Sequence, residues 1–262
     1  RDDRMDQWHA REQRHAVAEI AKQFSRLDEA VANLKRVKAN LKNFETALLR
    51  EAVEGRLLPG SVGGWRTVQV CEAGDVLLGR QRGPQYLTGR YPRKYLRVAN
   101  VKDDAIDFGD IETMDFDEVH FAKYRLLPRD ILVSEGQSPE LLGQSAIFCG
   151  YDEPLCFQKT LHRFRAYPKV TTPEFAQIVF RAHVRTGVFR RLGSITTNIG
   201  HLTLEKFRAA PFPLPPLAQQ HRIVAEVDRR QSVLRELEAE VEANMRRVEA
   251  LRQAILSTAF AE

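Results

Sequence analysis

The chain has 262 residues, 43% of them hydrophobic, and its 40 Lys and Arg against 35 Asp and Glu give a formal net charge of +5. This length allows one large domain or two smaller ones, and the mildly basic charge permits a nucleic-acid partner without requiring one. No apolar run approaches the ~20 residues that a bilayer requires. Three cysteines without a Cys-x-x-Cys pair predict reduced thiols, so we expect a cytoplasmic protein with no membrane partner.

The first part of the chain is repeated near its end. A shift that takes Leu34 to Val241 aligns the two segments over their whole length. The same shift aligns Leu41 with Val248, Phe44 with Leu251, and Leu48 with Ile255. Two copies of one element therefore bracket an unrelated stretch, and we expect half of a two-fold-symmetric assembly. DNA sites are the commonest targets that have two-part geometry of this kind.

Both copies have the pattern of a coiled-coil helix. Their apolar residues recur in steps of three and four from Val17 to Ala52 and from Val224 to Phe260, and neither segment contains an interior Pro or Gly. Each helix would be about 55 Å long. Gly55 and Pro59 are expected to end the first helix. The predicted helical segments are residues 1–59 and 214–262.

Each predicted helix needs a partner, because a narrow apolar stripe is not stable alone in water. The nearest partner is the other copy, so we expect an antiparallel pair. The repeat favours a rigid spacer that holds two globular units at a fixed separation, and a dimerisation stalk is the alternative interpretation. The residues expected to bind partner helices are Leu34, Leu41, Phe44, Leu48, Val241, Val248, Leu251 and Ile255.

Residues 60–213 predict a different, strand-rich domain. Short apolar runs such as 95–98, 131–133, 146–148 and 162–165 alternate with turn residues, which is typical of strands. Two stretches predict helices, Pro173 to Thr186 with Thr172 as N-cap, and Thr203 to Arg208. The predicted fold class is therefore α+β, a mixed domain between two long helices that form an antiparallel coiled coil.

Charge is segregated inside this domain. Residues 80–102 contain Lys and Arg but no acid, together with Gln, Asn and Tyr, whereas residues 103–118 are acidic and contain no base. Arg, Gln and Asn can read base edges, and Lys and Arg bind phosphates. The simpler interpretation is that the acidic run neutralises the basic run across a hairpin.

Two further segments, 134–140 and 193–201, are rich in Gly and small polar residues, and 156–165 alternates as a strand would. Glycine lets a backbone approach a ligand closely, although tight turns have the same composition. The residues expected to contact DNA are Arg80, Gln81, Arg82, Gln85, Arg93, Lys94, Gln137, Ser138, Gln158, Lys159, Thr196, Thr197 and Asn198. The Arg and Lys residues would bind phosphate or guanine, the Gln and Asn residues would read bases, and Ser138, Thr196 and Thr197 would support them.

Catalytic motifs are missing from the sequence. It has no G-x-G-x-x-G, no Walker A loop, no H-E-x-x-H and no metal-ligand spacing among its His and Cys residues. Asp130, Glu135 and Lys159 could suggest a metal-dependent nuclease, but scattered carboxylates of this kind are common. We therefore expect a binding protein that is not an enzyme and has no metal site.

Several segments, in order, resemble the second half of the specificity (S) subunit of type I restriction-modification systems. They are 93–101 (RKYLRVANV), 127–133 (LPRDILV), 156–159 (CFQK), 212–224 (FPLPPLAQQHRIV) and 251–256 (LRQAIL), which has an earlier copy at 44–49 (FETALL). Together with the internal repeat, the resemblance covers nearly the whole chain. It identifies residues 60–213 as a target recognition domain.

The resemblance implies that the domain reads one half of a bipartite DNA site. It also implies that the long helices dock methyltransferase (M) subunits, and that restriction (R) subunits join this complex. S-adenosylmethionine, ATP and Mg are then expected on the partner subunits, with no cofactor on this chain. A scaffold without DNA readout and a nuclease remain the alternatives.

The start of the chain leaves two arrangements open. The sequence begins with Arg1, and residues 6–11 do not resemble the Pro-rich approach to the second helix. We expect either an upstream recognition domain that precedes this sequence or a half-size subunit that pairs with a second copy of itself.

Overall fold

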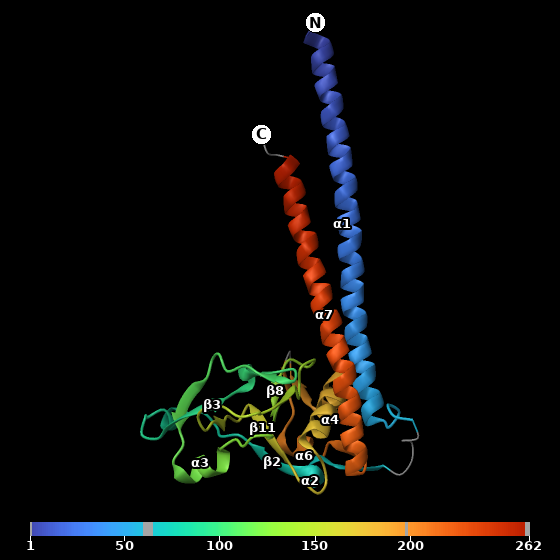
Figure 1. The fold of residues 1–262 in the computed structure, drawn as a ribbon. Helices are drawn as coiled ribbons and strands as arrows, with labels where there is room; N and C mark the ends of the chain where they lie inside the picture. The colour runs from blue at the N-terminus through green and yellow to red at the C-terminus, as the bar shows by residue number, and fades with distance from the viewer. Residues whose placement is uncertain (1, 60–64, 197–198, 260–262) are drawn as a thin grey trace. The chain divides into compact units, whose positions relative to one another are not determined.

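The computed structural model describes residues 2–59, 65–196 and 199–259 of the chain (Figure 1). The chain forms two compact units. Unit 1 comprises residues 1–45 and 229–262, and unit 2 comprises residues 46–228. Among the described residues, no helix combines the length and the apolar character needed to cross a bilayer.

Unit 1 is a pair of long helices. Helix α1 spans Asp2–Val53 and helix α7 spans Leu217–Ala259. Within unit 1 they lie side by side and run in opposite directions (Figure 1). Lys38 Nζ lies 3.0 Å from Glu242 Oε1, and Arg252 pairs with Asp28 and lies over the ring of Phe24. The expected antiparallel helix pair is therefore confirmed.

Both helices are longer than their apolar pattern predicted. Helix α1 begins near residue 2 because residues 2–16 contain neither Pro nor Gly to stop it. Helix α7 begins directly after Pro216, whose carbonyl accepts the backbone N–H groups of Gln219 and Gln220. The α1 helix is about 78 Å long at the standard rise per residue.

The inner ends of the helices belong to unit 2. Leu48, Leu49 and Ala52 of α1 are buried there, as are Ile223 and Val227 of α7. The compact units therefore divide within the helices rather than at 59/60 and 213/214. Leu48, one of the residues expected to bind partner helices, is 2% exposed and belongs to the core of unit 2.

The centre of unit 2 is an antiparallel four-stranded sheet with the order β2, β11, β7, β9. These strands span Gly74–Leu78, Leu161–Ala166, Ile131–Ser134 and Ser145–Ile147. Helix α4, Pro173–Arg185, packs on this sheet through Phe180, whose ring contacts Phe164 at 5.1 Å. Phe212 of β14, Pro211–Leu214, joins the same aromatic cluster, and β14 pairs with β1, Arg66–Gln69.

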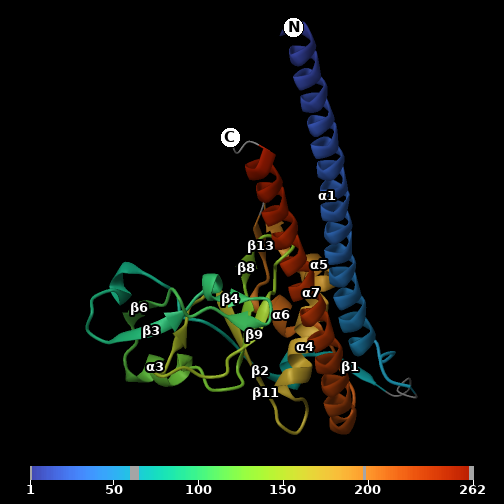
Figure 2. The ribbon, with the colours of Figure 1, turned by 45° about the horizontal axis from the view of Figure 1, so that its top comes forward.

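A second sheet has the order β10, β3, β6, with bounds Cys156–Phe157, Pro92–Leu96 and Glu112–Asp115. A third has the order β12, β13, β8, with bounds Ser194–Thr196, Ile199–His201 and Gly136–Gln137 (Figure 2). Strands β4, Val101–Lys102, and β5, Ala105–Ile106, form a small hairpin. The remaining elements are α2 (Val70–Ala73), η1 (Pro84–Tyr86), η2 (Val98–Asn100), α3 (Glu118–Tyr124), α5 (Val188–Leu192) and α6 (Leu204–Arg208).

The predicted elements of this domain are confirmed. Thr172 caps α4 by accepting the N–H of Phe175, and Pro173 occupies the first turn. Thr203 caps α6 in the same way by accepting the N–H of Lys206. The four apolar runs that predicted strands contribute to β3, β7, β9 and β11, so the α+β fold class is confirmed.

One histidine of β11 makes the stability of unit 2 depend on pH. His162 is buried and stacks on Phe207, and its Nε2 lies 2.7 Å from the carbonyl oxygen of Leu202. Its Nδ1 has no hydrogen-bond partner among the described residues. Burial lowers the pKa of His162 from 6.5 to about 4, because a charged ring could not be solvated there.

We therefore predict that the free energy of unfolding falls as the pH falls from about 6.5 to about 4. The unfolded chain binds a proton at His162 in this range and the folded chain does not, which costs up to roughly 3 kcal/mol. Urea unfolding across this range measures the effect. His162→Gln should flatten the pH dependence, with buried His183 as the residual contribution.

Candidate nucleic-acid interface

Four of the predicted contact segments meet along one edge of unit 2. Strand β8 pairs with β13, which places Gln137 opposite Gly200. Backbone N–H groups continue the connection, from Leu202 to the carbonyl of Glu135 at 2.8 Å and from Glu135 to the carbonyl of Thr160 at 2.9 Å. The N–H of Lys159 donates to the carbonyl of Arg80 at 2.8 Å. We call the polar surface formed by residues 80–85, 135–138, 158–160, 194–196 and 199–201 the recognition edge.

A glycine allows two parts of this edge to approach closely. Gly79 directly follows β2 and lies beside the chain at 158–159, where a Cβ would lie 2.1 Å from the carbonyl oxygen of Gln158. Any side chain there would push the two segments apart. Gly79 therefore allows the backbone of Arg80 and its neighbours to lie beside Lys159.

The recognition edge presents side chains that hydrogen-bond and side chains that carry positive charge. The exposed ones are Gln81, Arg82, Gln85, Lys159 and Thr196, and the half-buried ones are Gln137, Ser138 and Gln158. Gln158 Oε1 accepts a hydrogen bond from Thr160 Oγ1 at 3.2 Å, which fixes the orientation of its amide. Thr197 and Asn198 lie outside the described residues.

Arg80 has a structural role in this edge. It is 7% exposed, its Nη1 donates to the carbonyl of Asp115 at 2.7 Å, and its guanidinium stacks 4.1 Å from the ring centroid of Tyr86. We therefore no longer expect a direct contact between Arg80 and DNA, because its donors serve the domain itself.

The simpler interpretation of the segregated charge agrees with the structure. Strand β3 of the basic run pairs with β6 of the acidic run, and Arg93 lies 3.4 Å from Glu118. Arg82 lies 3.7 Å from Glu112, and Arg97 also pairs with Glu112. A hydrogen bond from the Tyr95 hydroxyl lowers the pKa of Glu112, and the positive charges of Arg97 and Arg82 lower it further.

Lys94 also has a carboxylate partner, which Lys159 lacks among the described residues. Lys94 Nζ lies 2.8 Å from Glu153, and this hydrogen bond raises the pKa of Lys94. Exposed pairs of this kind are worth little and can exchange for phosphate contacts. Among the described residues, Lys159 has no carboxylate partner, which makes it the cation of the recognition edge most accessible to a phosphate.

The sequence pattern did not indicate Lys206 as part of this surface. Its Nζ lies 2.8 Å from Ser194 Oγ, so α6 places an ammonium group beside β12. The signal was a lysine in the first turn after the N-cap Thr203, which by itself does not show what the side chain faces.

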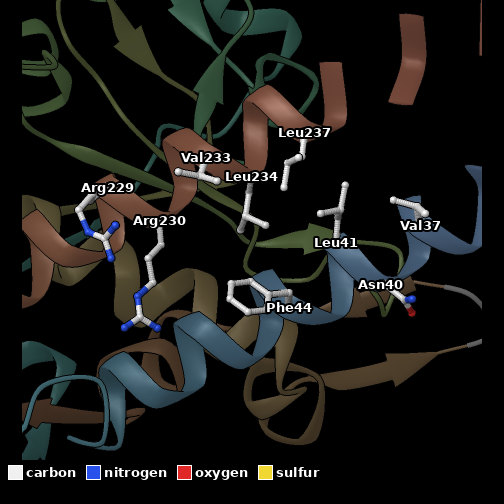
Figure 3. A pocket seen from close by; sticks show the side chains of 9 residues that line it. All are labelled: Val37, Asn40, Leu41, Phe44, Arg229, Arg230, Val233, Leu234 and Leu237. Atoms are coloured by element: carbon white, nitrogen blue, oxygen red, sulfur yellow. The ribbon is translucent and has the colours of Figure 1, made fainter. Parts of the chain in front are cut away.

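A second candidate surface lies within the helix pair. Figure 3 shows the groove of about 500 Å³ formed by Val37, Asn40, Leu41 and Phe44 of α1 and by Arg229, Arg230, Val233, Leu234 and Leu237 of α7. Leu234 and the predicted contact residue Val241 are buried, and Leu34, Leu41, Val248 and Ile255 are half-buried. Phe44 is 52% exposed and Leu251 is 50% exposed.

The groove is an apolar surface that the helix pair itself does not cover. Large exposed apolar patches rimmed by polar residues mark protein interaction sites. Among the described residues, no group of three His, Cys, Asp or Glu side chains could hold a metal ion.

Unit 2 thus has a polar recognition edge, and the helix pair of unit 1 has an apolar groove. The chain is similar over most of its length to type I specificity subunits. The chain is 26% identical over 259 residues to the type I restriction enzyme StySPI specificity subunit of Salmonella potsdam, covering 95% of this chain and 55% of that protein. It is 22% identical to the EcoKI specificity subunit of Escherichia coli K12, with the same coverage of both chains.

Two solved structures share this fold. One is a chain from a type I R-M system studied for complex assembly and conformational transition, with a TM-score of 0.68, 21% identity and coverage of 95% of this chain and 59% of that one. The other is the HsdS subunit of Thermoanaerobacter tengcongensis, with a TM-score of 0.59, 21% identity and coverage of 94% and 57%. No family model matches the chain. The expected resemblance to S subunits is confirmed, and the chain spans about half the length of the StySPI and EcoKI relatives.

We predict that Arg80→Ala destabilises the domain by roughly 3 kcal/mol, because it removes a buried charged hydrogen bond and a cation–π contact. Urea unfolding measures this loss. The neighbouring exposed Gln81→Ala should change the free energy of unfolding by less than about 0.5 kcal/mol. Equal stability of the two variants would show that Arg80 is not structural.

Proposed function

We propose that this chain is a DNA sequence-recognition module of a type I restriction-modification complex. The recognition edge of unit 2 reads one half of a bipartite site, and the groove of the helix pair docks a methyltransferase subunit. The observation that carries the proposal is that four polar segments, separate in the sequence, meet along one edge of the domain. The chain that contains them is similar over 95% of its length to two specificity subunits.

The chemistry of the recognition edge suits the task. Amide side chains such as Gln137 can form two hydrogen bonds with adenine, and an exposed ammonium such as that of Lys159 can bind a backbone phosphate. Because Arg93 and Lys94 are engaged with acids, their contacts with DNA require exchange of partners. The specificity of this module then depends on amides and hydroxyls, and its affinity depends on a few cations.

We propose that this chain has no catalytic step of its own. In this proposal S-adenosylmethionine, ATP and Mg belong to the methyltransferase and restriction subunits, and the chain positions these subunits on the DNA. Cleavage of DNA by the isolated chain with Mg²⁺ would support the nuclease alternative. Failure of the complex to prefer any DNA sequence would support the scaffold alternative.

Two variants of the recognition edge should have different effects on DNA binding. Gln137→Ala should relax specificity at one base pair by roughly 1–3 kcal/mol, because it removes a base-reading amide. Lys159→Ala should weaken binding to all sequences alike and reduce the salt slope by about one, because it removes a phosphate contact.

Binding of the complex with methyltransferase subunits to matched and mismatched duplexes, at several salt concentrations, measures both effects. The wild-type complex provides the reference slope. If neither variant changed specificity or the salt slope, the recognition edge would not be the DNA-binding surface.

The groove generates a separate prediction. Phe44→Asp should weaken association with the methyltransferase subunit by roughly tenfold or more, because it places a charge in an apolar docking surface. Co-purification and titration of the two subunits measure the loss. Val17→Asp is the matched control on the same helix, because Val17 is also exposed but does not line the groove.

The half-exposed position of Phe44 means that this variant should keep its helix content, which circular dichroism checks. Wild-type affinity of folded Phe44→Asp would contradict the docking assignment.

A further inference from the structure

The ribbon formed by β12 and β13 has two distinct faces. Thr196 lies opposite Ile199 in the register, so these two side chains share one face. Ile195 lies opposite Gly200, and Gly200 lies opposite Gln137 of β8, so these three residues share the other face. Side chains of successive residues in a strand point to opposite faces, which fixes this division.

The Gly200 face is turned toward the body of the domain. A Cβ on Gly200 would lie 3.0 Å from Leu142 Cδ2, and a Cβ on Gly193 would lie 2.4 Å from the same atom. Leu142 is buried, so the glycines let the ribbon rest closely on the core. The face with Thr196 and Ile199 is therefore the one turned away from the domain.

This outer face combines an apolar side chain with nearby positive charge. Ile199 is 53% exposed and Thr196 is also exposed. Ser194 and His201 are paired on the same face, and Ser194 Oγ lies 2.8 Å from Lys206 Nζ. His201 Nδ1 lies 3.7 Å from Glu135 Oε1.

A two-stranded ribbon has the width that the major groove of B-DNA admits. The apolar group on the base edges in that groove is the thymine methyl, which side chains recognise by apolar contact. A lysine at the base of the ribbon suits the phosphates that flank the groove. The outer face thus has the shape, the apolar contact and the charge that a thymine-containing major groove requires.

We propose that Ile199, supported by the methyl group of Thr196, contacts a thymine methyl and makes thymine part of the half-site that this chain reads. This inference rests on the proposed function and names a specificity-determining contact within it. The β12–β13 ribbon enters the major groove by this outer face, and Gln137 of β8, on the opposite face of the same sheet, lies at the margin of the contact. Lys206 binds a phosphate at the edge of the same groove.

The test uses the complex of the chain with its methyltransferase subunits. Mapping the adenines that the complex methylates first gives the half-site, and each thymidine in it is then replaced, one at a time, by deoxyuridine. Replacement of at least one thymidine should weaken wild-type binding about fourfold, which is the effect expected for one buried methyl group. Ile199→Ala should bind the thymidine duplex about fourfold more weakly and should no longer distinguish deoxyuridine at that position.

Ile195→Ala is the matched control, because it removes an equally large exposed side chain from the inner face of the same ribbon. It should keep the full response to deoxyuridine. Thermal unfolding confirms that both variants are folded, and Ile199→Val should retain most of the response because it keeps a branched apolar side chain.

Three results would overturn the inference while leaving the proposed function intact: a half-site without thymine, a wild-type complex indifferent to every deoxyuridine, or full sensitivity retained by Ile199→Ala. Loss of the response in Ile195→Ala would overturn the assignment of the outer face. A wild-type complex with no sequence preference at all would overturn the proposed function itself.

Discussion

The apolar seam between α1 and α7 is the interaction on which unit 1 depends. Each helix is polar except along one stripe, and such a helix is not stable alone in water. The pair buries Leu234 and Val241, while the surface ion pair of Lys38 and Glu242 contributes at most about 1 kcal/mol. Burial of apolar side chains therefore decides that the helices pair, and the ion pairs help to set their register. The seam does not use the whole stripe, because Phe44 and Leu237 remain exposed around a groove.

Periodicity and repetition were sufficient to predict the helix pair. A stripe in steps of three and four indicated helices, and the aligned copies indicated that each helix is the partner of the other. The boundaries were less predictable, because the apolar stripe begins later than the helix does. Residues 2–16 continue α1 simply because nothing in them breaks a helix. Periodicity also could not distinguish Leu48 in the core of unit 2 from Leu41 in the seam, because both occupy the same stripe.

The recognition edge was predictable in its parts but not in its assembly. Small polar residues and glycines marked 134–140 and 193–201, yet the pairing of Gln137 with Gly200 joins residues far apart in sequence and has no local signal. The basic run, residues 80–102, was the most conspicuous feature of the sequence, but it was the least direct indicator of which residues contact DNA. Arg80 and Asn100 are buried, and Arg93 and Lys94 face acids, because an antiparallel hairpin brings the acidic run beside the basic one. Ile199 carries no polar group, so its residue type did not indicate a DNA contact. Only its position on the outer face of the ribbon suggests this role.

Distances between spin labels in unit 1 test the pairing of α1 with α7 most directly. With the native cysteines replaced, labels at positions 38 and 242 should be close and narrowly distributed, because Lys38 and Glu242 are in contact. Moving the first label from position 38 to position 22 should displace it by roughly 24 Å along the axis, away from position 242. Long or broad distances for the first pair, or a shorter distance after the move, would contradict the pairing of these helices.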